Sequence, residues 1–175
     1  MDLFKIFKAY QAGINMNKLK ILGLTLLFSS TVAHSVELKQ VYSLDLQTAK
    51  VIACEAERVC KNIQQNIAVA VVDQGGNTLY AHRHESVGPH NLDAAEQKAF
   101  TALSTKTATL ALSQTANSNP DAKNLTTVSK LLLLGGGLPI RYQNQVVGAL
   151  GVAGAGGAKN DDYCATSAIQ ILKNL

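Results

Sequence analysis

The feature that most constrains the fold is an unbroken apolar run from Ile67 to Val72, rich in β-branched residues. A short continuous apolar run of this kind is typical of a buried strand. The turn-forming residues 73–77 (Asp-Gln-Gly-Gly-Asn) follow it, and 78–84 then predicts a returning strand. The chain is therefore expected to hold a β-hairpin whose first strand lies in the core.

A second hairpin is predicted near the end of the chain. Residues 138–142 and 145–152 are rich in apolar residues and flank the turn pair Gln143-Asn144. Pro139 cannot donate a ladder hydrogen bond, so it suits a strand start or an edge strand.

Segments with helical spacing of apolar residues lie before, between and after the hairpins. We expect helices over 44–65, capped by Ser43; from Asn91 to about Ser104; from Thr107, as the cap, to about Ala116; and from Asn160-Asp161-Asp162 to about Leu172. Two hairpins flanked by helices predict a single α+β domain, an α/β sandwich with a mostly antiparallel sheet.

Residues 1–35 have the pattern of a secretory signal peptide. A basic stretch over 16–20 precedes an apolar run over 21–28, and small residues lead to Ala33-His34-Ser35, which suits signal peptidase. The run is too short to span a bilayer. We therefore expect cleavage after Ser35, a periplasmic or secreted protein, and a single domain over 36–175. Either Met1 or Met16 could be the true start.

The formal charge of +4 belongs mostly to this leader, which carries four lysines and one aspartate. Without it, the remaining chain of about 140 residues is close to neutral. The basic balance therefore does not predict nucleic-acid binding, and no membrane span is expected once the leader is removed.

Three cysteines remain after the leader. Cys54 and Cys60 lie on one predicted helix, about 9 Å apart along its axis, which exceeds the reach of a disulfide. Either could bridge to Cys164 if the first and last helices pack together, which would leave one free thiol.

Three of the four histidines fall close together, at His82, His84 and His90. In a strand, His82 and His84 point to the same face, and neutral imidazoles are good ligands for metals and haem iron. His90 lies just before a helix, where backbone N–H groups favour an anion such as a propionate. We take all three as candidate ligand residues, with His84 and His90 as candidate metal ligands; ordinary surface positions are the alternative.

Lys98 and Thr101 share one face of the helix that follows His90. Lys98 could pair with a carboxylate, and both residues are candidates for lining a cofactor pocket. For Lys98 a structural or pocket-lining role is favoured over catalysis. The glycine-rich stretch after Gly148 lacks the spacing of a dinucleotide-binding loop.

Several sequence motifs occur in one order along the chain: AVAVVDQGGNTLYAHRHE, LDAAEQKAFTA, GGGLPI and VVGALGVAGA, followed by a pair of aspartates. Together they resemble the GlcG/HbpS haem-binding family over roughly residues 44–172. The resemblance implies a profilin-like α/β fold, homo-oligomers and a pocket that can take haem. Around 83–86 and in the loop VGPHN this chain departs from the common pattern, which places extra imidazoles near that pocket and weakens the transfer of any one axial ligand.

Two function classes follow from these residues. The first is an exported haem-binding protein that acts as an oligomeric haem buffer or sensor accessory. The second is an enzyme acting on haem or on a small carboxylate metabolite, with Lys98 and a histidine as acid–base groups.

Overall fold

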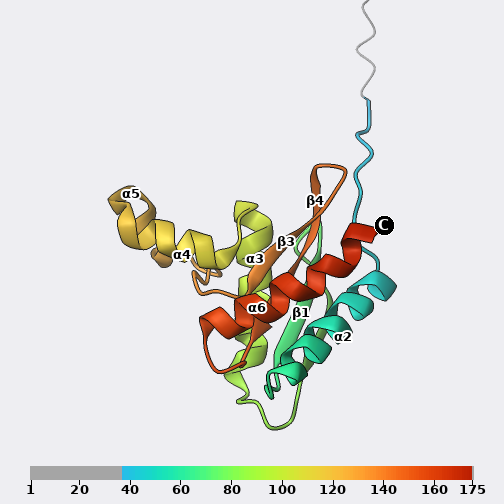
Figure 1. Cartoon of the computed structure of the whole chain (residues 1–175). Helices are drawn as coiled ribbons and strands as arrows, with labels where there is room; N and C mark the ends of the chain where they lie inside the picture. The colour runs from blue at the N-terminus through green and yellow to red at the C-terminus, as the bar shows by residue number, and fades with distance from the viewer. Residues whose placement is uncertain (1–36, 175) are drawn as a thin grey trace, which may run out of the picture. The chain divides into compact units, whose positions relative to one another are not determined.

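The computed structural model describes residues 37–174, which contain a four-stranded antiparallel sheet in the order β2-β1-β4-β3 (Figure 1). Both predicted hairpins are present, and β1 of the first pairs with β4 of the second in the middle of the sheet. Pro139 lies on β3, an edge strand, as its missing N–H requires. The strands are β1 Ala68–Asp73, β2 Thr78–Arg83, β3 Gly137–Tyr142 and β4 Gln145–Ala153.

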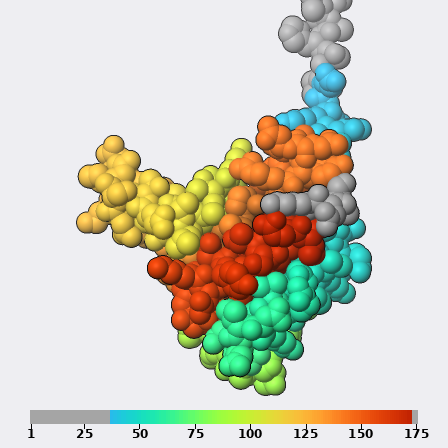
Figure 2. Space-filling model, viewed as in Figure 1, coloured from blue at the N-terminus to red at the C-terminus, as the bar shows by residue number. Residues whose placement is uncertain are grey.

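Helices cover both faces of the sheet, which confirms the predicted α+β sandwich. Helices α2 and α6 pack together on one face, and α3 covers the other (Figure 1). Figure 2 shows α4 and α5 (yellow) projecting beyond these layers. The helices are α2 Leu46–Asn62, α3 His90–Thr105, α4 Thr109–Ser118, α5 Pro120–Lys123, η1 Asn124–Thr127, α6 Ala158–Ile169 and η2 Gln170–Asn174.

The two faces of the central strands carry side chains of different size. On β1, Val69 and Val71 face α2 and α6, whereas Ala68 and Ala70 face α3. Strand β4 repeats this division: Leu150 and Val152 belong to the larger core, and Ala149 and Ala153 to the α3 side. Both faces of β1 are therefore buried, which explains its continuous apolar sequence.

Small residues let α3 lie very close to the sheet. Ala95, Ala99 and Ala102 of α3 are fully buried against the alanine face of the strands. At Gly151 of β4, a Cβ atom would lie 1.9 Å from the backbone oxygen of Ala95. Only glycine fits that position.

A disulfide between Cys60 and Cys164 joins α2 to α6, with their Cα atoms 5.4 Å apart. The first and last helices therefore do pack together, as a bridge to Cys164 requires. Cys54 has a free and exposed thiol.

Two predicted helix caps are wrong because the side chains concerned bond elsewhere. Helix α2 is capped by Asp45, which accepts the amide of Thr48 at 2.7 Å, while Ser43 instead accepts the amide of Gln74 at 3.3 Å. Before α4, the Thr107 hydroxyl donates to the oxygen of Thr105, and Ala108 occupies the cap position.

The last helix begins earlier and ends earlier than its sequence predicts. Helix α6 starts at Ala158, because Gly157, with φ of 141°, precedes it in a conformation that other residues rarely adopt. After Ile169 the chain tightens into the 3₁₀ turn η2.

The predicted leader over 1–35 lies outside the described residues. Within 37–174, no helix is both long enough and apolar enough to cross a membrane.

Candidate functional site

The candidate site is centred on His82, on the edge strand β2, and on Glu57, which faces it from α2. His82 Nδ1 lies 2.7 Å from Glu57 Oε1. The carboxylate accepts a hydrogen bond from the Nδ1–H, so a neutral His82 ring carries its free lone pair on Nε2. The His82 side chain is 49% exposed, so Nε2 is accessible to a ligand.

His84 is held in the opposite tautomer. The backbone N–H of Ser86 donates to His84 Nδ1 at 3.2 Å, and the Ser86 hydroxyl lies 2.8 Å from the same nitrogen. A neutral His84 therefore carries its proton on Nε2, which becomes a hydrogen-bond donor. Glu85 Oε2, at 3.6 Å from Nδ1, can pair with the ring only when the imidazole is protonated.

His82 and His84 line one small polar cleft between the end of α2 and β2. Glu57, Lys61 and Gln65 supply most of its other polar side chains, and the volume is about 100 Å³. The two imidazoles, which were expected to point to the same side, thus line one cleft, although His84 follows the last residue of β2.

His90 is not among the residues that line this cleft. It is the first residue of α3 and is exposed, with its ring against Gly88. Its predicted role as an anion or metal ligand remains a prediction. Among residues 37–174, no group of three or more His, Cys, Asp or Glu side chains could hold a metal ion.

Lys98 lies inside the fold, with only 1% of its surface exposed. Its ammonium donates to Asp161 Oδ2 at 2.7 Å and to the backbone oxygen of Val152 at 2.9 Å. The other oxygen of Asp161 accepts the amide of Ala155 at 2.8 Å. This buried ion pair ties α3 to the end of β4 and the start of α6, so the carboxylate partner of Lys98 is within the chain.

Thr101 is also fully buried and uses its hydroxyl internally. It donates to the oxygen of Gln97 at 2.7 Å and accepts the amide of Leu132 at 2.8 Å. These contacts fasten the segment before β3 to α3. For Lys98 and Thr101, cofactor binding remains a prediction, and their polar atoms already have partners.

The glycines at 135–137 serve close packing around the same ion pair. A Cβ atom at Gly137 would lie 2.3 Å from the oxygen of Lys98, and one at Gly136 would lie 2.4 Å from the oxygen of Val152. Backbone segments therefore approach each other closely at both glycines.

Asp162, next to Asp161, is the one polar side chain in the described part of the chain with a buried atom, Oδ1, that lacks a hydrogen-bond partner. Burial raises the pKa of its carboxyl above the ordinary value, and Asp161 adds to the effect, whereas Gly136 and Lys98 oppose it. The carboxyl is therefore more easily protonated than an exposed aspartate.

Comparison with known proteins decides the family. The family model described as "Haem degrading protein HbpS-like" matches residues 44–170. The chain belongs to this HbpS-like family. The resemblance inferred from the motifs is thereby confirmed.

HbpS-like relatives share both sequence and fold with this chain. An uncharacterized 15.0 kDa protein of Citrobacter freundii, encoded between dhaT and dhaS, is 30% identical over 78% of this chain and 97% of its own length. A double mutant of Streptomyces reticuli HbpS is 34% identical, with a TM-score of 0.73 over 80% of this chain and 94% of that one. The structure of a PduOC–haem complex is 26% identical, with a TM-score of 0.65 over 73% and 94%.

The structure also explains the HbpS-like motifs in physical terms. In the alanine-lysine-threonine helix, the alanines allow α3 to approach the sheet, Lys98 forms the buried ion pair, and Thr101 anchors the following segment. The first aspartate of the DD pair is the partner of Lys98. These motif residues therefore stabilise the fold and do not line the polar cleft at His82.

Sequence reasoning missed Glu57 and Asp161. Glu57 is one acidic residue in an amphipathic helix, and only the packing of α2 on β2 brings it to His82. For Asp161 a signal existed in the sequence. It follows a glycine-rich segment, and it could have been paired with Lys98, which lies on a helix rich in alanine.

Proposed function

We propose that this HbpS-like protein binds haem through His82 and does so as an exported homo-oligomer. The observation that carries the proposal is the contact of 2.7 Å between His82 and Glu57. Family membership supports it, as does similarity to a protein whose structure is a haem complex.

The Glu57–His82 pair has the arrangement that favours iron ligation. A carboxylate that accepts a hydrogen bond from one ring nitrogen fixes the orientation of the imidazole and makes the other nitrogen a stronger ligand for the metal. His84, whose Nε2 carries the proton, would instead donate a hydrogen bond, and Lys61 would pair with a propionate.

The donor set suits haem better than a bare metal ion. The porphyrin supplies four nitrogen ligands, so a single imidazole is enough to complete a haem site. Within residues 37–174 no three-residue group of metal-binding side chains is available. Haem bound to His82 would supply its iron and its redox chemistry, and the chain would supply the ligand, its orientation and the polar contacts.

The size of the cleft supports a homo-oligomer. A volume of about 100 Å³ is far below the 300 to 1,000 Å³ of typical ligand sites. One chain would therefore cover only part of a haem, and a second copy in a homo-oligomer would cover more of it.

Export is supported by the leader pattern over 1–35 together with the disulfide. Disulfides persist in the periplasm and outside the cell and are rare in the cytosol. The Cys60–Cys164 bridge therefore suits a periplasmic or secreted protein.

We do not propose that Lys98 acts as an acid–base group. Its ammonium is buried and already bound to Asp161 and Val152. A proton transfer from it would break the contact that joins α3 to α6.

Absorbance titration with haem tests the proposal. We expect saturable binding of about one haem per chain, at least a tenfold loss of affinity in His82→Ala, and a loss of about 10-fold in Glu57→Gln. The matched control is His90→Ala, on an exposed residue outside the cleft, which should bind like the parent protein. The proposal fails if His82→Ala binds like the parent, or if His84→Ala or His90→Ala alone abolishes binding.

A further inference from the structure

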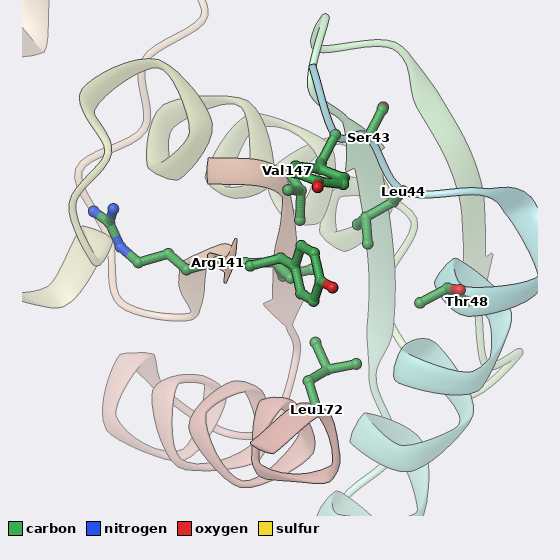
Figure 3. A pocket seen from close by; sticks show the side chains of 9 residues that line it. Ser43, Leu44, Thr48, Arg141, Val147 and Leu172 are labelled. Carbon is green, nitrogen blue, oxygen red and sulfur yellow. The ribbon is translucent and has the colours of Figure 1, made fainter. Parts of the chain in front are cut away.

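A second pocket lies away from the histidines, between the two ends of the described domain and the second hairpin (Figure 3). Residues 42–44, which precede α2, form one side, and the ends of β3 and β4 form another. Leu172 of η2 closes the far side. The volume is about 220 Å³, and none of the described residues lines both this pocket and the cleft at His82.

The floor of the pocket is part of the hydrophobic core. Ile140 is 1% exposed and Val147 is 4% exposed, and both belong to the large cluster beneath α2 and α6. Leu44 and Leu172 pack against the same cluster from the sides. A molecule that enters the pocket would therefore meet an apolar and rigid surface.

Two exposed tyrosines, Tyr42 and Tyr142, line the pocket. The rings of Tyr42 and Tyr142 meet edge to face, with their centroids 5.0 Å apart. The amide of Leu44 donates to the oxygen of Val147 at 3.1 Å, which fixes the segment that carries Tyr42 against β4. Aromatic rings held in this way favour another ring, by edge-to-face or offset contact.

Among the described residues that line the pocket, none points a charged group into it. Arg141 contributes its aliphatic stem, but its guanidinium points away and donates to the backbone oxygen of Lys106 at 2.9 Å (Figure 3). The polar groups among the lining residues are hydroxyls, such as that of Thr48. An anionic ligand would lose its hydration here without gaining a cationic partner.

The volume limits the size of the ligand. An apolar cavity of about 150 Å³ holds benzene, whereas drug-sized ligands occupy 300 Å³ or more. A pocket of about 220 Å³ lies between these values. We propose that this pocket is a second ligand site, which binds a neutral aromatic molecule of one or two rings.

Indole is a suitable probe, because the chain has no tryptophan and indole can be excited at wavelengths where the chain's tyrosines absorb little. In a titration of the full chain, we expect saturable binding of about one indole per chain, with a dissociation constant of about 1 mM or lower. Indole-3-carboxylate, which adds a negative charge to the same rings, should bind at least tenfold more weakly.

Variants test the location. Val147→Phe fills the pocket and should weaken indole binding at least tenfold. Val128→Phe makes the same substitution at an exposed position outside the pocket and should leave binding unchanged. If Val147→Phe fails to give a cooperative thermal transition, Thr48→Phe blocks the pocket from the half-buried face of α2.

Three outcomes would overturn the proposal: no saturable indole binding by the folded protein, equal affinity for the anionic probe, or unchanged binding in the folded pocket-filling variant. His82→Ala, which tests the haem site, should leave indole affinity unchanged, and a loss there would also contradict a separate site.

Discussion

The Cys60–Cys164 bridge should contribute much of the stability of the domain. It closes a loop with a sequence separation of 104 residues between α2 and α6. In the chain-entropy model, a loop of this length lowers the entropy of the unfolded chain by about 16 cal/mol/K, or about 4.7 kcal/mol at 25 °C. The total stability of a domain is typically 5–15 kcal/mol, so reduction should remove a large share of it.

Urea unfolding followed by far-UV circular dichroism, with and without reductant, measures this contribution. For an m-value of about 2 kcal/mol/M, the loss of 4.7 kcal/mol lowers the midpoint by about 2 M. Cys54→Ser is the matched control, because Cys54 is exposed and free, and the reductant should affect it as it affects the parent protein. The thiol count in denaturant should be one per chain in the parent and zero in this control.

Two results would refute the reasoning. Three free thiols in the denatured, unreduced parent protein would show that the bridge is absent. A single thiol, combined with a midpoint shift below about 0.5 M on reduction, would show that loop closure contributes little.

The remaining predictions concern the charged groups between α3 and α6. Lys98→Met leaves the carboxylate of Asp161 buried without its cationic partner, so it should lower the free energy of unfolding by about 3–5 kcal/mol. The double change Lys98→Met with Asp161→Leu should recover part of this loss. Equal stability of the parent and Lys98→Met in urea would contradict the ion pair. For Asp162, a folded-state pKa raised above 3.8 means that the folded protein binds the proton more tightly than the unfolded chain, so stability should fall as pH rises from about 4 through the folded pKa. Asp162→Asn should remove that part of the pH dependence in urea unfolding between about pH 4 and 7, and an unchanged slope would show that Asp162 is not its source.

The sheet could be predicted from the sequence because its signals are local. The run Ile67–Val72 is apolar on both faces of a strand, and the turns after it and at 143–144 carry the expected residues. Burial of β1 by helices on both sides then follows from its composition.

Helix ends were harder to predict, because a side chain that could cap a helix can instead form a hydrogen bond with a residue distant in sequence. Ser43 has the right chemistry for a cap, yet its hydroxyl accepts the amide of Gln74, and Asp45 caps α2 instead. The start of α6 depends on the backbone conformation of Gly157, which the sequence does not specify.

The candidate site was predicted only in part. Strand periodicity predicted that His82 on β2 and His84 just after it would lie together, and both line one cleft. Their tautomers depend on Glu57 and Ser86, and the contact with Glu57 exists only after α2 packs on the sheet. Likewise, the partner of Lys98, Asp161, lies 63 residues further along the chain. The buried ion pair that they form therefore could not be predicted from the residues on one face of α3.

The most direct test of the haem site is chemical rescue of His82→Gly by free imidazole, monitored by haem absorbance. If His82 ligates the iron, this variant should lose the spectrum of imidazole-ligated haem and regain it, at parent-like affinity, when imidazole occupies the space left by the side chain. If His82→Gly shows the parent spectrum without imidazole, the iron ligand lies elsewhere and the proposed site is wrong.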